Sequence, residues 1–295
     1  MTICCPLCDV EKDCRKIGDF KGVNEPFLNK SLVMCEDCKL LFINPMPSEE
    51  LLDKYYKTSW LNDSRIVSKS FEKEVVYKIQ AEERVKYLKN HIDLRSMKKM
   101  LDIGSGFGYF IKELKENTLS DVVFYAIDPC PEHLKRIEAL GAKPFDSLDQ
   151  VSEKALDFVS ICFVLEHIGN TGQHLSKIRG CLKQGGYLFI DVPQRDDLFK
   201  PILEPHVVVF DKESLINLAV ATGYELVHIS SYGREQESLI KELKKGRSLF
   251  LKMASRLSNL LPFTRRLFLY RYFKFHIEGE KRWWIRAIFK KKDNQ

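Results

Sequence analysis

Short apolar runs alternate with amphipathic segments over most of the chain after residue 98. Runs rich in β-branched and aromatic residues, bounded by glycine or charged residues, predict seven strands, at 100–103, 122–127, 142–145, 156–164, 187–192, 224–231 and 282–289. Apolar residues at helical spacing predict helices between them, beginning near residue 107 and spanning 131–140, 173–182 and 211–221. This order predicts an α/β fold with a doubly wound, Rossmann-like seven-stranded sheet.

Three glycines follow the first of these strands on alternate positions, Gly104, Gly106 and Gly108, and helical spacing resumes directly after them. Such a loop exposes its backbone and presents free N–H groups to a ligand at a helix start. Tyr109 stands where a dinucleotide fingerprint has its third glycine, and the loop lacks the Lys-Ser/Thr pair of a P-loop. The alternative is an ordinary strand–turn–helix that holds no ligand.

An acidic residue ends the second strand. Asp128 lies 24 residues beyond Gly104, close to the spacing at which a βαβ unit places a carboxylate on ribose hydroxyls. The glycine loop and this acid together predict a nucleoside-containing cofactor. The alternative for Asp128 is a loop acid or a helix cap.

Two Cys-x-x-Cys pairs lie near the N-terminus, separated by 26 residues. Cys5, Cys8, Cys35 and Cys38 can present four thiolates to one tetrahedral zinc, and such a closed site is structural. Cys4 is an alternative to Cys5 as a ligand. Nine cysteines without a secretory signal favour a reducing, cytoplasmic setting with thiols used for metal.

The positive charge is concentrated at the C-terminus. Residues 239–295 carry 16 basic and 4 acidic side chains, whereas the whole chain has a net charge of +6. Apolar residues at helical spacing accompany this charge, which predicts an amphipathic helix over 250–261. We expect this segment either to dock on an anionic surface, such as the inner face of a membrane, or to pack on the sheet or a second copy.

These features divide the chain into five segments. Residues 1–46 form the zinc module and 47–95 a helical linker or lid, including an amphipathic helix over 71–92 and the aromatic pair Tyr55 and Tyr56. Residues 96–233 form the cofactor domain, 234–279 a basic insertion, and 280–295 the last strand and a basic tail. The aromatic pair either packs at the domain junction or contacts a ligand.

Taken together, these motifs resemble the class I S-adenosylmethionine-dependent methyltransferases that carry an N-terminal Cys4 module. The resemblance rests on the two Cys-x-x-Cys pairs, the segment 102–108, Asp128, the run Val164-Leu165-Glu166-His167, and Glu204-Pro205-His206 followed by Phe210. It implies S-adenosylmethionine as cofactor and a small-molecule, sugar or glycan acceptor methylated on oxygen or carbon. The implied cofactor-binding residues are Asp102, Gly104, Ser105, Gly106, Gly108, Asp128, Asp146 and Phe163.

The resemblance also implies catalytic residues. His206 matches a proposed base of sugar-nucleotide C-methyltransferases and follows the strand at 187–192, where a ligand is expected. Imidazole titrates near neutrality and can accept the proton of a hydroxyl or carbon acid. Glu166 and His167 follow the strand at 156–164 and are expected to orient the acceptor or to cap a helix. A histidine bonded within its own loop is the alternative for His206.

Two other functions compete with this interpretation. One is an RNA methyltransferase with a zinc knuckle, although the strand ending at Val164 lacks the Asn/Asp-Pro-Pro-Tyr run of amino-directed enzymes, so nucleic acid is not the expected partner. The other is a non-catalytic, cofactor-binding scaffold. The sequence leaves the acceptor and the oligomeric state open.

Overall fold

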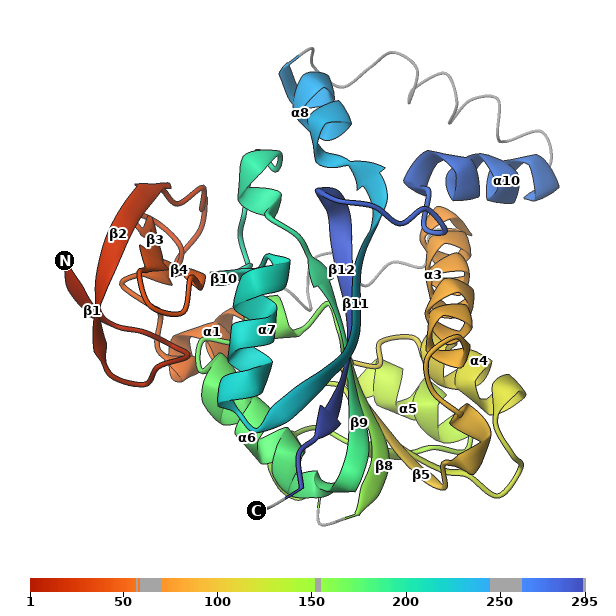
Figure 1. Ribbon diagram of the computed structural model, residues 1–295. Coiled ribbons are helices and arrows are strands. Elements are labelled where there is room, and N and C mark those ends of the chain that lie inside the picture. Colours follow the sequence, from red (N-terminus) through yellow and green to blue (C-terminus); the bar gives the residue numbers. More distant parts are fainter. Residues whose placement is uncertain (57, 59–70, 152–154, 245–261, 294–295) are drawn as a thin grey trace.

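A computed structural model describes residues 1–56, 58, 71–151, 155–244 and 262–293 of the chain. The predicted amphipathic helix over 250–261 therefore lies outside the described residues. The structure has two sheets, a large central sheet and a smaller one formed mainly by the N-terminal residues (Figure 1). Buried residues of both sheets belong to one hydrophobic cluster.

The central sheet confirms the predicted fold. Its strand order is β11-β12-β9-β8-β5-β6-β7, and β12 runs antiparallel to both of its neighbours while the other pairs of neighbours are parallel. The strands are β5 (Lys99–Ile103), β6 (Val123–Ile127), β7 (Lys143–Phe145), β8 (Leu156–Cys162), β9 (Leu182–Pro193), β11 (Tyr224–Glu235) and β12 (Arg282–Lys291). Each lies where the pattern predicted it, with β9 and β11 longer than expected.

Helices cover both faces of this sheet (Figure 1). One face carries α3 (Phe71–Lys89), α4 (Tyr109–Asn117) and α5 (Pro131–Ala139), and the other carries α6 (Thr171–Cys181) and α7 (Lys212–Ala221). Side chains of a strand alternate between the faces, so Phe158 packs with the first group and its neighbour Val159 with the second. Because both faces are buried, the central strands are apolar at nearly every position.

The N-terminal module forms an antiparallel sheet in the order β1-β2-β3-β4-β10. Its first four strands are β1 (Thr2–Cys4), β2 (Glu11–Asp19), β3 (Ser31–Cys35) and β4 (Leu41–Asn44). The fifth, β10 (Val208–Val209), comes from the segment between β9 and α7. The large domain therefore contributes a strand to the module, which sequence reasoning did not predict.

Shorter elements connect these parts. Helix α1 (Glu49–Tyr55) follows its N-cap Ser48, whose hydroxyl accepts the Leu51 N–H at 3.3 Å. Single-turn 3₁₀ helices are η2 (Leu94–Ser96), η3 (Leu148–Gln150), η4 (Leu165–His167) and η5 (Asp196–Leu198).

The described part of the C-terminal insertion consists of α8 (Gln236–Lys244) and α10 (Pro262–Phe273). Helix α10 lies across α3 (Figure 1), where Arg266 donates to the Glu82 carboxylate at 2.8 Å and the Tyr270 hydroxyl donates to Glu83 at 3.2 Å. Phe273 packs against Trp283 and Trp284, so part of the aromatic run faces inward. Among the described helices, none is both long and apolar enough to cross a membrane.

Candidate active site

The glycine loop connects the end of β5 to the start of α4. Gly104, Gly106 and Gly108 all have positive φ, at 73°, 51° and 75°, and Gly108 is the N-cap of α4. A Cβ at Gly104 would overlap Val164, whereas a Cβ at Gly106 would meet no heavy atom within 4 Å. The loop is thus closely packed behind Gly104 and open at Gly106, where a ligand can approach the backbone.

Asp128 joins this loop to the next helix. Its Oδ2 accepts the Gly106 N–H at 2.7 Å, and its Oδ1 accepts the Cys130 N–H at 2.9 Å and contacts His133 Nδ1 at 2.9 Å. The residue is 5% exposed. Cys130, not Asp128, is the N-cap of α5, so the cap alternative is not realised. A carboxylate has about four acceptor positions, and these three contacts leave one of them.

The other predicted cofactor residues are placed around this loop. Asp102 is buried on β5 and accepts the Ser160 hydroxyl at 2.6 Å, and burial raises its pKa to about 7. Ser105 donates to the Ile127 carbonyl at 3.2 Å. Phe163 directly follows β8 with φ of 56°, and Asp146 is exposed after β7. The structure thus places all of them at or near the carboxyl ends of β5, β6, β7 and β8.

The predicted catalytic residues lie together. Glu166 and His167 belong to η4, which begins three residues after β8 ends, and His206 lies in the loop after β9. The ring centroids of the two histidines are 4.8 Å apart in an edge-to-face arrangement, and one polar atom from each of the three residues falls within 4.8 Å of the others. The structure therefore brings together three residues that are up to 40 positions apart in the chain.

His206 has a charged partner that sequence reasoning missed. Its Nδ1 lies 2.7 Å from Oδ2 of Asp196, which also accepts the Lys200 ammonium at 2.9 Å. Burial lowers the pKa of His206, Lys200 lowers it further, and Asp196 opposes both. For Asp196, burial favours the neutral acid, but Lys200 and His206 outweigh burial and lower the pKa of this carboxyl. A neutral imidazole held by a carboxylate is suited to accept a proton.

Glu166 is 2% exposed, and its Oε2 has no hydrogen-bond partner. Burial raises the pKa of this carboxyl to about 8, so it is largely protonated at neutral pH. Burial also lowers the pKa of His167 well below its usual value, and its Nδ1 lies 3.4 Å from the Pro205 carbonyl. The Lys200 ammonium lies 3.5 Å from both ring nitrogens of His206.

A buried ion pair lies between α3 and β9, next to the end of β8. Arg84 Nε on α3 donates to Asp191 Oδ2 on β9 at 2.7 Å, and the Tyr232 hydroxyl donates to Asp191 Oδ1 at 2.6 Å. The Phe163 N–H donates to the Asp191 carbonyl at 2.8 Å, which ties this pair to the end of β8. No sequence signal distinguished Arg84 from the other charges of its helix, or Asp191 from an exposed residue at a strand end.

The four predicted zinc ligands also lie together. One sulfur from each of Cys5, Cys8, Cys35 and Cys38 falls within 4.8 Å of the others, and the Cys5 and Cys38 sulfurs are 3.5 Å apart. Cys5 and Cys35 are fully buried, whereas Cys4, the alternative ligand, is exposed. Four clustered thiols fit a tetrahedral zinc.

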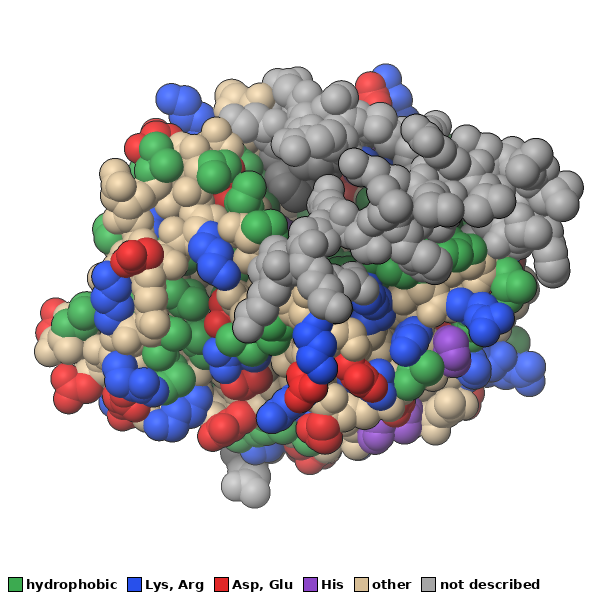
Figure 2. All heavy atoms as spheres, turned by 90° about the horizontal axis from the view of Figure 1, so that it is seen from above, with side chains coloured by type: hydrophobic (Ala, Val, Ile, Leu, Met, Phe, Trp, Pro, Cys, Tyr) green, Lys and Arg blue, Asp and Glu red, His purple; other side chains and the backbone are tan. Residues whose placement is uncertain are grey.

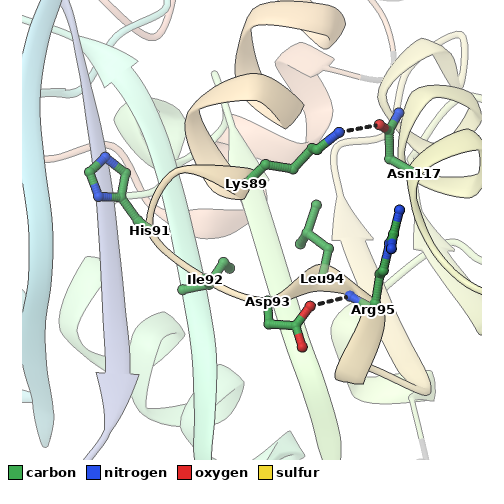
Figure 3. Close-up of a pocket in the computed structure, with 7 residues that line it drawn as sticks. All are labelled: Lys89, His91, Ile92, Asp93, Leu94, Arg95 and Asn117. Carbon is green, nitrogen blue, oxygen red and sulfur yellow. Dashed lines mark hydrogen bonds between the residues drawn. The ribbon is translucent and has the colours of Figure 1, made fainter.

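A separate pocket lies at the opposite end of the strands (Figure 3). It is lined by residues from the end of α3 through η2, with Lys89 donating to the Asn117 side chain at 3.2 Å. The pocket is at the amino ends of the parallel strands, and its lining residues include none of the predicted site residues. Figure 2 views the other end of the molecule, where acidic and basic side chains are interspersed over the described surface.

The strand order, the antiparallel β12 and the glycine loop after the first strand of the sheet define the class I methyltransferase fold. Residues 77–229 match the model of a family described as a methyltransferase domain. Because this match spans more than half of the chain, the chain belongs to that methyltransferase family.

Solved structures with the same fold are similar to this chain at low identity. One is a SAM-dependent methyltransferase from Archaeoglobus fulgidus, with 20% identity over 72% of this chain and 94% of that one, and a TM-score of 0.50. Another is a Galdieria sulphuraria protein described as a sarcosine dimethylglycine methyltransferase, with 19% identity over 72% and 85% of the two chains, and a TM-score of 0.50. No curated protein matches the chain.

Proposed function

We propose that the protein transfers a methyl group from S-adenosylmethionine to oxygen or carbon of a small-molecule, sugar or glycan acceptor. The observation that carries this proposal is that two groups of residues lie together at the carboxyl ends of the parallel strands. The open glycine loop with Asp128 suits a nucleoside cofactor, and the Glu166–His167–His206 cluster lies at the neighbouring strand ends.

The cofactor, when bound, supplies an already activated methyl group. The chain's own residues then align the acceptor with it, and alignment of this kind can account for roughly 7–11 kcal/mol of a barrier. Gly104–Gly108 and Asp128 hold the cofactor, with Asp128 accepting a ribose hydroxyl. Glu166 and His167 orient the acceptor.

His206 removes the proton that the acceptor loses. Its Nδ1 faces the Asp196 carboxylate, so its Nε2 is the ring nitrogen that receives the proton. Asp196 holds the ring and stabilises the imidazolium that forms. A positioned base of this kind contributes typically 10²–10⁴-fold.

The N-terminal cysteines hold zinc with a structural role. Four thiolates fill a tetrahedral coordination sphere and leave no position for an acceptor.

Binding of labelled S-adenosylmethionine to the purified chain tests the proposal. Saturable binding with about one site per chain is the expected result, and transfer of label to a panel of sugar and small-molecule acceptors would then name the acceptor class. A chain that binds the cofactor but transfers to none of them would fit a scaffold, and copurified nucleic acid would favour an RNA acceptor.

A further inference from the structure

The loop that carries His206 is held by the N-terminal module rather than by the large sheet alone. The Ile43 N–H on β4 donates to the Val207 carbonyl at 3.0 Å, and β10 continues this antiparallel pairing with β4. At the other end of the loop, the Leu203 N–H donates to the Lys21 carbonyl at 2.9 Å. Main-chain hydrogen bonds to the module therefore flank His206 on both sides.

Glu204 adds the densest set of contacts between the loop and the module. Its Oε2 accepts the backbone N–H groups of Val23 at 2.8 Å and Asn24 at 2.9 Å. Its Oε1 accepts the Asn24 side-chain amide at 2.8 Å and the Tyr55 hydroxyl at 3.0 Å. All four donors lie outside the large sheet, and the carboxylate uses each of its acceptor positions.

The partners of His206 are tied to the module as well. The Lys21 ammonium donates to the carbonyls of Asp197 at 2.7 Å and Lys200 at 3.1 Å. These carbonyls belong to the turn that presents Asp196 and Lys200 to the imidazole. One module residue thus holds the backbone of the segment that sets the charge around His206.

The second cysteine pair lies in the turn that positions β4. Cys35 ends β3 and Cys38 precedes β4, and the Cys35 N–H donates to the Leu40 carbonyl at 3.0 Å. A metal held by these thiolates fixes the β3–β4 turn, and β4 in turn pairs with β10, which begins two residues after His206.

Aromatic side chains form a second connection. Phe27 of the module contacts Tyr55 with ring centroids 4.9 Å apart, Tyr55 contacts Tyr56 at 5.6 Å, and Tyr56 contacts His167 at 5.9 Å. His167 is in turn the neighbour of His206. The module's core is therefore continuous with the histidine cluster.

We propose that Glu204 is a positioning residue that fastens the His206 loop to the zinc module, so that the metal state of the module controls the geometry of the proton acceptor but not cofactor binding. The proposal rests on the proposed function, because it assigns a catalytic role to His206. Among the described residues, the hydrogen bonds of Asp128 go to Gly106, Cys130 and His133 rather than to the module, so the cofactor site should stay intact when the module loosens.

Hydrogen exchange on the full chain tests this without knowledge of the acceptor. In Glu204→Ala, exchange of the 203–209 peptide should rise at least about tenfold, while the 99–111 peptide, zinc content and S-adenosylmethionine affinity stay unchanged. Removing zinc from the unmodified chain with a chelator should produce the same local rise. Glu280→Ala is the matched control, because this glutamate is 80% exposed and bonds only Lys212 among the described residues.

Two further measurements separate positioning from a general loss of stability. The NMR-monitored pKa of His206 should rise toward its usual value in Glu204→Ala, because the ring is no longer held in a buried position. Asn24→Ala should show a smaller rise in exchange, and the double variant should be no worse than Glu204→Ala alone.

The proposal is overturned if the 203–209 peptide stays protected in Glu204→Ala and after zinc removal, or if exchange rises equally in the 99–111 peptide. An unmodified chain that fails to bind S-adenosylmethionine would instead overturn the proposed function, whatever the exchange shows.

Discussion

At the scale of single residues, environment rather than residue type decides which histidine can act. His206 is 8% exposed and bonded to a buried carboxylate, whereas His167 faces a carbonyl and an aromatic ring. The Asp196 carboxylate therefore stabilises a protonated His206 ring more directly than the Pro205 carbonyl stabilises that of His167. This difference supports the proposed role of His206 as the base and of His167 as a contact of the acceptor.

Replacing His206 tests that assignment. His206→Ala should lower turnover by a factor on the order of 10² or more, because no imidazole then takes up the proton that the methylated substrate releases. Cofactor affinity, measured by calorimetry, should not change, since in the described part of the chain the contacts of this ring are with His167, Asp196 and Lys200 rather than with the proposed cofactor residues. His228→Ala is the matched control, and unchanged turnover of His206→Ala under conditions where chemistry limits the rate would remove His206 from the mechanism.

Glu166 predicts a pH dependence of stability. Burial raises its folded-state pKa from 4.5 to about 8, against a smaller opposing effect of Lys200. The folded state therefore binds more protons than the unfolded state between these values, and the free energy of unfolding should fall as pH rises through this window. Urea unfolding across the range should show this fall in the unmodified chain and a weaker one in Glu166→Gln; equal slopes would contradict the assignment.

At the scale of elements, the hydrophobic pattern predicted the large sheet well and the contacts between segments poorly. Buried parallel strands are apolar throughout, so β5 and β8 stood out in the sequence. Strand β10 did not, because two residues carry no periodicity and their pairing with β4 is a long-range contact. Asp196 was missed for the same reason: its bond to His206 depends on how the loop after β9 turns back.

The four-cysteine cluster belongs to this scale, since it joins the β1–β2 turn, which carries Cys5 and Cys8, to the β3–β4 turn, which carries Cys35 and Cys38. Metal analysis should find about one zinc per chain, retained in Cys4→Ser and lost in Cys35→Ser, because Cys4 is exposed and Cys35 is buried in the four-thiol cluster. The cofactor domain should remain folded in both variants. Full zinc content in Cys35→Ser would exclude the proposed ligand set.

At the scale of the whole molecule, charge is distributed unevenly. The C-terminal residues carry the excess of basic side chains, yet one described arginine of that segment, Arg266, pairs with Glu82 of α3. The inward aromatic residues of α10 favour packing on the molecule over docking. Contact with an anionic membrane therefore stays a prediction that rests on residues 245–261.

Sedimentation with anionic vesicles tests that prediction. Docking predicts binding that falls with salt and is lost when residues 239–277 are replaced by a short linker, because each basic side chain near an anionic surface contributes roughly 1 kcal/mol. Neutral vesicles serve as the control. A chain that stays in the supernatant with anionic vesicles at low salt would show that the segment packs internally or against a second copy.

We propose that the glycine loop and Asp128 hold S-adenosylmethionine, and calorimetry of Asp128→Ala measures whether this carboxylate contributes to cofactor binding. Asp128 bonds Gly106 and retains an acceptor position, so its loss should weaken cofactor binding by about 1.5–3 kcal/mol through the missing charge-assisted contacts. Asp149→Ala is the matched control, since this exposed carboxylate pairs with Lys177 away from the loop. Weakened binding in Asp128→Ala with unchanged binding in Asp149→Ala is the predicted result. Equal affinity of Asp128→Ala and the unmodified chain would show that Asp128 does not hold the cofactor.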